Sequence, residues 1–317
     1  MRVLESLPRE PFSQPCALTI GTFDGVHRGH GLLIARLREE AARRDLPSAV
    51  LTFQDMPYCY FKPDECSRLL TLPDEKTAAF EPLQIDNLLI VPFDQSIAEQ
   101  SAEEFAHRVL VEKLKTRLLV VGPDFALGKG RAGDIAALQT LGEKHGFEVV
   151  VLRDKLEDEG AISSTRIREC VEDGHMRTAA RLLGRPFELS GEVVSGQQLG
   201  RTIGVPTINL QVHARKVLPS NGVYACHAFL DESSTRLRAA LNIGNRPTVS
   251  GQSLSVEFHV IGEDIPIAPK VARLQIIERL RDERKFAGLD ELVGQMKLDI
   301  ARADVILRDL SNVEQTS

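Results

Sequence analysis

This sequence has no long hydrophobic run, no excess of positive charge and few cysteines, and each absence excludes a class of protein. No apolar stretch approaches the roughly 20 residues that a membrane-spanning helix needs. The first residues carry acids and prolines where a signal peptide needs an apolar segment. The 45 Asp and Glu outnumber the 39 Lys and Arg, which argues against a general nucleic-acid-binding protein because such proteins need a basic face. We therefore expect neither a membrane nor nucleic acid as a partner.

The cysteine content excludes two further classes of protein. The five cysteines are Cys16, Cys59, Cys66, Cys170 and Cys226, an odd number without CxxC spacing. This pattern is typical neither of a disulfide framework nor of a four-cysteine zinc site. It favours a reducing compartment, and we expect a cytoplasmic protein whose oligomeric state the sequence leaves open.

The first half of the chain alternates strand-like and helix-like segments. Short runs rich in Leu, Ile and Val, typical of strands buried on both faces, occupy residues 16–22, 48–53, 86–92, 117–122 and 147–152. Amphipathic stretches lie between them, at residues 30–45 and at 101–114, where Ser101 and Glu104 have capping-box spacing. This alternation predicts an α/β domain with a parallel sheet, whose ligands bind at the carboxyl ends of the strands.

The second half has a different residue pattern, which predicts an antiparallel barrel or sandwich. Strand-like runs separated by glycine, proline and asparagine occupy residues 187–195, 205–210, 221–230, 236–243, 254–260 and 271–278. A final amphipathic helix is expected over 289–308. We place the domain boundary in the linker before Pro186, giving domains of residues 1–185 and 186–317.

A glycine-rich segment, GTFDGVHRGH, follows the first long strand at residues 21–30. Glycines in a turn that opens a helix let the backbone N–H groups approach an anion. His27 and His30 are three residues apart, so both imidazoles can donate to phosphate oxygens and stabilise charge during nucleotidyl transfer. The alternative is an ordinary glycine turn with two surface histidines.

A second helix start, ISSTRIRE, lies at residues 162–169. Its hydroxyls are good helix caps, and the arginines that follow could bind a triphosphate. The alternative is an ordinary capped helix with solvent-facing arginines, which would have the same sequence.

The segment GEVVSGQQLGRTIGVPTINL, residues 191–210, is the strongest motif of the second half. Its glycines allow a loop to lie against phosphates, and Thr207 and Asn209 alternate onto one face of the next strand. Their oxygens are ligands that Mg²⁺ accepts. The alternative is a β-hairpin with glycine turns. Further along, Glu257 and His259 share a strand face, where Glu257 at the barrel mouth could be a general base or simply a salt-bridged residue.

The N-terminal motifs, together with GPDFALGKGRAGD at residues 122–134, resemble the nucleotidyltransferase module of prokaryotic bifunctional riboflavin kinase/FAD synthetases. The resemblance implies a Rossmann-like domain that uses ATP and magnesium, accepts FMN and releases pyrophosphate to give FAD. It implies catalytic roles for His27, His30 and Arg166. It also implies nucleotide-binding roles for Gly21, Phe23, Asp24, Gly25, Asp124, Lys129, Ser163, Ser164 and Thr165.

The C-terminal half resembles the riboflavin kinase domain of the same family. The resemblance implies an antiparallel β-barrel with a terminal helix, in which Glu257 takes the proton from the ribityl hydroxyl of riboflavin while Thr207 and Asn209 organise Mg·ATP. Nucleotide-binding roles are implied for Gly196, Gly200, Arg201, Gly204 and Pro206. The string LRDERKFAGLDEL at 280–292 would close over the flavin through Arg284 and Phe286.

Two segments depart from the family pattern. The family's usual Phe-Glu-Pro-His-Pro string is Phe-Gln-Asp-Met-Pro at residues 53–57, and the hairpin at 261–270 is rebuilt. We expect Met56, Pro57 and Phe61 to contact the flavin. The departures leave two alternatives to the bifunctional enzyme. One is a paralogue with kinase activity only or with a different adenylylation acceptor, and the other is a non-catalytic flavin- or nucleotide-binding regulator.

Overall fold

The computed structural model describes residues 1–153, 160–195, 204–231, 233–248 and 251–315. The chain divides into two compact units, Met1–Ser164 and Thr165–Ser317. Among the described residues, no helix is both long enough and apolar enough to cross a membrane.

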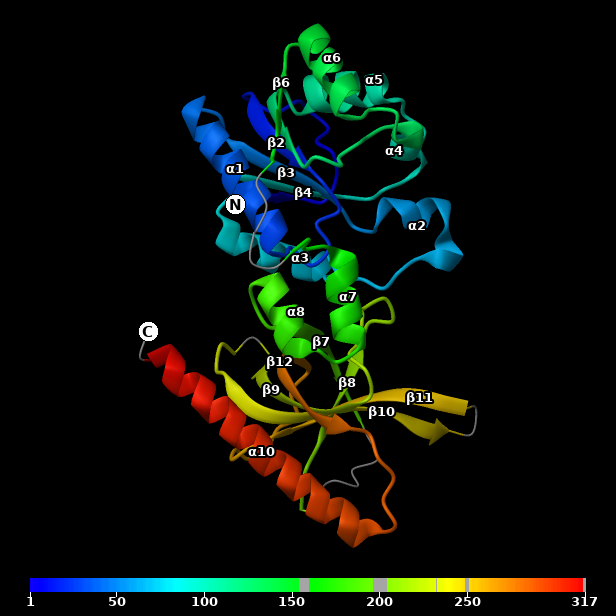
Figure 1. The fold of residues 1–317 in the computed structure, drawn as a ribbon, viewed down its shortest axis with the longest axis vertical. Helices are drawn as coiled ribbons and strands as arrows, with labels where there is room; N and C mark the ends of the chain where they lie inside the picture. Colours follow the sequence, from blue (N-terminus) through cyan, green and yellow to red (C-terminus); the bar gives the residue numbers. More distant parts are fainter. Residues whose placement is uncertain (154–159, 196–203, 232, 249–250, 316–317) are drawn as a thin grey trace. The chain divides into compact units, whose positions relative to one another are not determined.

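The first unit (Figure 1) contains a parallel sheet. The sheet has six strands in the order β1-β4-β3-β2-β5-β6. Its strands are β1 (Arg2–Leu4), β2 (Cys16–Ile20), β3 (Ser48–Phe53), β4 (Asn87–Val91), β5 (Thr116–Val121) and β6 (Glu148–Val151). The α/β fold and the strand ranges expected between residues 16 and 152 are confirmed. Strand β1 was not expected. It has only three residues, and its main-chain pairing at the sheet edge requires no hydrophobic period in the sequence.

Helices cover both faces of this sheet. They are α1 (Arg28–Arg43), α2 (Pro57–Phe61), α3 (Pro73–Phe80), α4 (Gln95–Ala98), α5 (Ala102–Phe105) with its π-helical continuation η3 (Ala106–Lys113), and α6 (Ile135–His145), with short 3₁₀ turns η1 (Pro63–Glu65), η2 (Glu81–Leu83) and η4 (Lys129–Arg131). Successive strand residues enter different cores: Ala17 packs with Leu37 of α1, and Leu18 packs in the cluster of Leu110 and Leu138. The apolar strand runs are therefore explained by burial on both faces.

The strand order reverses between β2 and β5, which are neighbours in the sheet. From β2 the chain continues to β3 and β4 on one side, and it then returns across the sheet to β5 and β6 on the other side. Ligands of open α/β sheets bind beyond the carboxyl ends of the strands at such a reversal. The segments that follow β2 and β5 are therefore the place to look for a site.

The second unit is a closed antiparallel barrel with the order β10-β11-β8-β7-β12-β9. Its strands are β7 (Phe187–Val194), β8 (Ile208–Val212), β9 (Gly222–Leu230), β10 (Leu237–Thr248), β11 (Gly251–Val260) and β12 (Val271–Asp282). The barrel fold is confirmed, and the register of each strand pair is antiparallel throughout.

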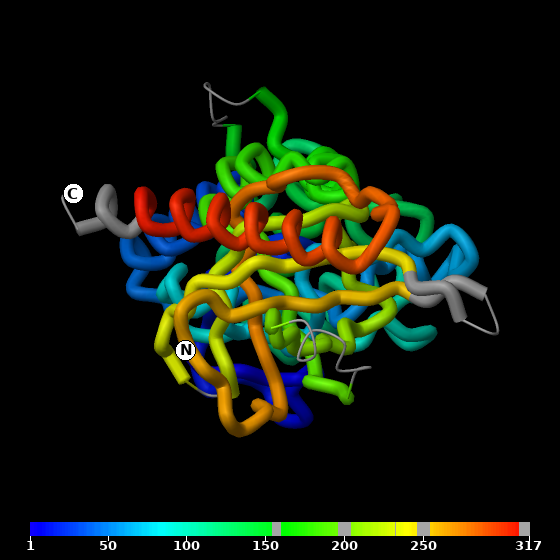
Figure 2. Tube along the Cα trace, turned by 90° about the horizontal axis from the view of Figure 1, so that it is seen from below, coloured from blue at the N-terminus to red at the C-terminus, as the bar shows by residue number. Residues whose placement is uncertain are grey.

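Within the described part of the second unit, helices pack beside the barrel strands. They are α7 (Ser164–Glu172), α8 (Met176–Leu183) and α10 (Leu289–Gln315). Helix α10 lies across the barrel strands (Figure 2), with Ala303 and Leu307 buried against Val223 and Ala225 of β9. Helix α8 packs against β7 and β12. The compact units divide between Ser164 and Thr165, at the start of α7, whereas the boundary proposed after residue 185 lies further along the chain.

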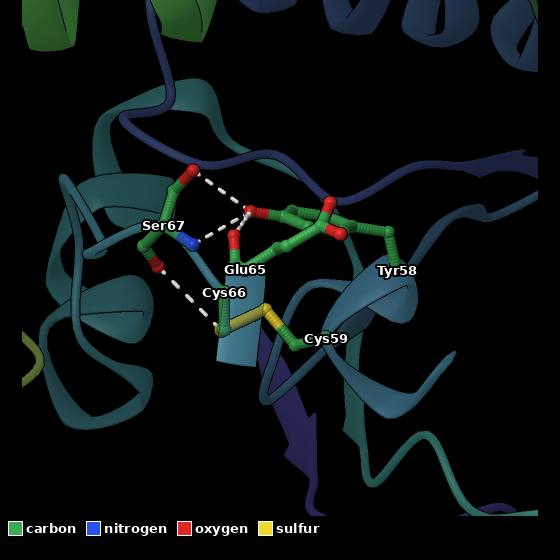
Figure 3. Close-up of a disulfide and its surroundings, with 5 residues drawn as sticks. All are labelled: Tyr58, Cys59, Glu65, Cys66 and Ser67. Carbon is green, nitrogen blue, oxygen red and sulfur yellow. Dashed lines mark hydrogen bonds between the residues drawn. A yellow bond between two sulfur atoms is a disulfide. The ribbon is translucent and has the colours of Figure 1, made fainter. Parts of the chain in front are cut away.

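One pair of cysteines forms a disulfide, a bond that the number and spacing of the cysteines did not indicate. Cys59 of α2 and Cys66 are bonded (Figure 3), while Cys16, Cys170 and Cys226 are free thiols. Tyr58 adds a second tie to this segment, because its hydroxyl donates to the carbonyl oxygen of Glu65 at 2.6 Å. The two cysteines are seven residues apart. A search for CxxC spacing does not find such a pair.

Candidate active sites

The turn that follows β2 has an unusual backbone. Phe23, Gly25 and Val26 all have positive φ, at 46°, 86° and 41°. Left-handed conformations cost non-glycine residues about 1–2 kcal/mol, and such strain is concentrated at functional sites. The strained turn lies at the carboxyl end of β2, beside the reversal of strand order. The structure thus places the residues of the first motif where a ligand is expected.

His27 and His30 lie against each other at the start of α1. Their rings are stacked, with centroids 3.6 Å apart, and His27 is nearly buried. Each backbone N–H donates to the Nδ1 atom of the other ring at 3.3 Å, which caps the helix. Because both Nδ1 atoms accept, a neutral ring carries its proton on Nε2. This tautomer can donate to a phosphate oxygen from Nε2.

Asp24 connects the two N-terminal motifs. Its main-chain oxygen accepts a hydrogen bond from the Ser164 hydroxyl at 2.8 Å. Its carboxylate is 1% exposed and accepts from the backbone N–H groups of Leu70 and Thr71 at 2.9 and 3.1 Å. The structure therefore brings Ser164 of the ISSTRIRE segment to the glycine turn. The Asp24 carboxylate itself organises the protein backbone.

Lys76 of α3 belongs to this region, although no role was expected for it from the sequence. It is 2% exposed, and its Nζ donates to the carbonyl oxygens of Thr22 and Phe53 and to the Thr52 hydroxyl. Burial lowers the pKa of Lys76 to about 8, although the nearby carboxylates of Asp24 and Asp55 favour the charged form. A lysine after two acids is also the composition of an ordinary helix start, so the residue type alone assigns Lys76 no role.

The loop after β5 carries Asp124 and Lys129, both exposed. Arg131 donates to the carbonyl oxygen of Asp124 at 2.9 Å. Gly128 has φ of 76°, and an added Cβ would lie 2.5 Å from the backbone nitrogen of Ala102. The glycine is therefore required by both conformation and space. The loop is fixed in place while its two charged side chains face solvent.

The residues after β3 that were expected to contact the flavin differ in their exposure to solvent. Met56 is only 7% exposed and packs with Cys59, Leu69 and Leu72, directly before Pro57 begins α2. Phe61, in contrast, is 60% exposed.

Phe61 belongs to a group of three aromatic rings. Its ring centroid lies 5.3 Å from that of Tyr60 and 6.0 Å from that of Phe93, which follows β4. Tyr60 is 44% exposed. Phe61 was expected to contact the flavin, whereas Tyr60 and Phe93 were not. Phe93 lies in the turn after β4, which carried no motif. An exposed cluster of this kind suits a planar aromatic ligand.

Glu257 of β11 is the centre of the second candidate site. The hydroxyl of Ser255 donates to Oε1 at 2.7 Å, and the hydroxyl of Thr207 donates to Oε2 at 3.2 Å. Asn209 is the cross-strand partner of Glu257 on β8, so the two side chains share a face. The structure thus brings together the three residues expected to organise Mg·ATP and take the proton, and it adds Ser255.

The Glu257 side chain was expected to face the barrel mouth, and its direction follows from the burial of its neighbours. Its neighbours Val256 and Phe258 are buried, at 4% and 0% exposure, whereas Glu257 is half-buried. Because successive strand residues alternate between faces, Glu257 points away from the barrel interior.

A cavity of about 540 Å³ adjoins this site. Its wall is formed by the end of β7, the start of β8 and the rebuilt hairpin: Val193, Val194, Ser195, Pro206, Thr207, Ile208, Asn209, His259, Val260, Glu263, Asp264, Ile265, Pro266, Ala268 and Pro269. His259 Nδ1 donates to the carbonyl oxygen of Pro206 at 2.8 Å. Thr207 lines the cavity and also contacts Glu257, so the cavity and the carboxylate are connected.

The remaining expected residues have less defined surroundings. Gly196, Gly200 and Arg201 lie outside the described residues, whereas Gly204 has φ of 76° in the loop before β8. Gly21 follows β2, and Ser163, Thr165 and Arg166 surround the start of α7.

Arg284 and Phe286 follow β12 and lie together. The guanidinium carbon of Arg284 is 4.7 Å from the Phe286 ring centroid, and Arg284 also pairs loosely with Glu291 of α10. The segment that the resemblance assigns to the flavin is therefore held next to the start of α10.

Comparison with known proteins agrees with this architecture. A family model described as FAD synthetase matches residues 9–166, and one described as riboflavin kinase matches residues 183–307. The bifunctional riboflavin kinase/FMN adenylyltransferase of Escherichia coli K12 is 38% identical over 94% of this chain and 95% of its own. The protein of the same description from Haemophilus influenzae is 38% identical over 92% of this chain and 94% of its own.

One solved structure matches nearly the whole length of this chain. It is described as a macrolide-efflux protein from Streptococcus pneumoniae, with a TM-score of 0.84, 28% identity, and coverage of 94% of this chain and 96% of its own. Its description concerns that protein, and the shared feature is the fold.

A parallel-sheet unit followed by a closed antiparallel barrel, matched by one family model each, defines a two-domain transferase. The chain belongs to the family of bifunctional riboflavin kinase/FMN adenylyltransferases.

Proposed function

We propose that this chain phosphorylates riboflavin to FMN in the barrel unit and adenylylates FMN to FAD, with release of pyrophosphate, in the parallel-sheet unit. The observation that carries the kinase half is the carboxylate of Glu257, which two hydroxyls hold beside a cavity of about 540 Å³. The adenylyltransferase half is carried by the strained turn and its paired histidines at the reversal of strand order.

In the kinase step, Glu257 is the general base. It accepts the proton of the ribityl 5′-hydroxyl, whose oxygen then forms a bond to the γ-phosphorus of ATP while the bond to the β-phosphate oxygen breaks and ADP leaves. Ser255 and Thr207 fix the orientation of the carboxylate, which is the main requirement for a base that works by position.

Mg²⁺ fits the oxygen-rich donor set of this site. The Thr207 hydroxyl and the side-chain oxygen of Asn209 are hard ligands on the face that carries Glu257. These two residues would hold the ion, which when bound to ATP neutralises charge on the phosphates. Pro206 and the glycines of the preceding loop would place the nucleotide.

In the adenylyltransferase step, a phosphate oxygen of FMN attacks the α-phosphorus of a second ATP and pyrophosphate leaves. His27 and His30 donate from Nε2 to the developing negative charge, while the main chain of Gly21–Gly25 and the hydroxyls at the start of α7 hold the triphosphate. Lys129 and Arg166 supply positive charge. Asp124 assists from the loop after β5.

The flavin ring in this step rests on the aromatic group of Tyr60, Phe61 and Phe93 rather than on Met56. The exposures of 44% and 60% leave Tyr60 and Phe61 accessible, whereas Met56 is buried. In the barrel unit, Arg284 and Phe286 cover the riboflavin ring. Because both reactions consume ATP, we place the enzyme in the cytoplasm.

The test is to incubate purified protein with riboflavin and Mg·ATP and to separate the products by chromatography. We expect FAD, with FMN as a transient. FMN that accumulates without FAD would reduce the function to that of a kinase, and unchanged riboflavin would refute the proposal and support a binding protein without turnover.

A further inference from the structure

Lys76 occupies a special position in the first unit. Its side chain reaches from α3 to two adjacent strands and donates to the oxygen of Thr22, just beyond β2, and to that of Phe53, the last residue of β3. It also donates to the Thr52 hydroxyl at 3.4 Å, and this hydroxyl donates in turn to the oxygen of Thr22 at 2.9 Å. One ammonium group thus joins the ends of two strands.

The two strand ends lead to different parts of the candidate site. Thr22 directly precedes the strained turn from Phe23 to His27, where the nucleotide is proposed to bind. Phe53 directly precedes the segment that leads through α2 to the exposed Phe61, where the flavin ring is proposed to rest. A displacement of one strand end against the other would therefore change the distance between the two substrates.

The chemistry of lysine suits this role. An ammonium group has three donors, and three oxygen acceptors surround it here. A buried charge is costly in a protein, and the pKa of Lys76, lowered by burial to about 8, reflects that cost. A merely space-filling role would be served at lower cost by an apolar side chain.

We propose that Lys76 is a positioning residue for adenylyl transfer: by holding the oxygens of Thr22 and Phe53 on one ammonium, it sets the nucleotide turn against the segment that binds the flavin. The proposal rests on the proposed function, and in particular on its adenylyltransferase half. Lys76 acts through the backbone and does not touch the reacting atoms.

The first experiment compares Lys76→Met with the parent and with Lys113→Met. Lys113 also donates to a main-chain oxygen of this unit, that of Pro8 at 3.3 Å, but it belongs to η3 and lies away from the strand ends just described. FAD formation from supplied FMN is measured at saturating ATP. The rate is divided by the fraction of chains that quench flavin fluorescence on binding FMN, so that unfolded chains do not count.

For Lys76→Met we expect a loss of about 100-fold in this corrected kcat, because a misplacement of about 1 Å has that effect on a reaction between two bound substrates. The KM values for FMN and ATP should stay within about threefold of the parent. Phosphorylation of riboflavin by the same chains should be unchanged, and Lys113→Met should match the parent in both reactions. A corrected kcat of Lys76→Met within threefold of the parent would overturn the positioning role.

Thr52→Val provides a second test if the first unit of Lys76→Met does not fold. It removes one acceptor of Lys76 and one donor to Thr22, and we expect a smaller loss of about tenfold in corrected kcat. An unchanged kcat in Thr52→Val would also count against the proposal. A parent that makes no FAD from FMN would overturn the proposed function as well, whereas an active parent with fully active variants would overturn only the role of Lys76.

Discussion

Glu257→Gln removes the charge of the proposed base and keeps the shape of its side chain. A glutamine has only one acceptor oxygen, so one of its two hydroxyl partners must adapt. Ser255 is nearly buried and donates at 2.7 Å, whereas Thr207 donates at 3.2 Å and lines the cavity. We expect the amide oxygen to face Ser255 and the amide nitrogen to face Thr207, whose hydroxyl can rotate to accept.

The structural cost of this change is small, because one hydrogen bond is exchanged for another. We expect the free energy of unfolding of the barrel unit to change by at most about 1 kcal/mol, which corresponds to a factor of about 5 in an equilibrium constant. Loss of a general base lowers a rate by about 10²–10⁴-fold, or roughly 3–5 kcal/mol. The expected loss of rate is therefore too large to be explained by the expected change in stability.

The assay measures FMN formed from riboflavin and Mg·ATP, with urea unfolding followed in parallel. Glu192→Gln is the matched control, since Glu192 is an exposed residue of β7 and undergoes the same chemical change. We expect the control to keep the parental rate and Glu257→Gln to lose at least 100-fold while still converting supplied FMN to FAD. An FMN rate within tenfold of the parent would refute the assignment of Glu257 as the base.

Three further changes test the first unit. His30→Ala should lower FAD formation from FMN by about 10²–10³-fold, since it removes a donor to the developing charge, and should leave the kinase rate unchanged; an equal loss of both rates would contradict separate sites. Phe61→Ala should raise the KM for FMN by about tenfold, as expected for the loss of roughly 1–1.5 kcal/mol of ring stacking, with the KM for ATP unchanged. Because the pKa of Lys76 is lowered from 10.5 to about 8 in the folded protein, the unfolded chain binds the proton more tightly between these values. The free energy of unfolding of the first unit should therefore rise with pH across that window, relative to Lys76→Met, by on the order of 3 kcal/mol. Urea titrations at pH 7.5 and 10 measure this difference, and parallel curves for the two proteins would contradict it.

Periodicity and glycine placement predicted most of the fold. The strand runs were visible because burial on both sheet faces demands apolar residues in succession, and the barrel strands because turn residues separate them. Strand β1 depends on main-chain pairing with β4, which leaves no period in the sequence. Helix α8 packs against the barrel strands β7 and β12, a contact that the linker-like composition of its segment does not reveal.

The motifs located the candidate sites, but the supporting residues came only from the structure. His27, His30, Thr207 and Glu257 could be named because their residue types match a chemistry at a given spacing. Lys76 could not, since its role depends on acceptors supplied by residues 22, 52 and 53, distant in sequence and brought together by parallel strands.

The segment proposed to contact the flavin shows the same limit. Met56 occupies a position that the family pattern assigns to the site, yet its side chain is buried beside the Cys59–Cys66 disulfide. The exposed ring of Tyr60 and the half-buried ring of Phe93 were not predicted, because their centroids, 5.9 Å apart, belong to residues from two different connections of the sheet.

The central claim is that two separate sites on one chain act on the flavin in turn, and mixing two variants tests it most directly. Glu257→Gln alone, and His30→Ala alone, should make almost no FAD from riboflavin and Mg·ATP. Together in one solution they should make FAD, because FMN released by the second variant is adenylylated by the first. If the mixture made none, or if either substitution abolished both half-reactions, the assignment of one reaction to each unit would be contradicted.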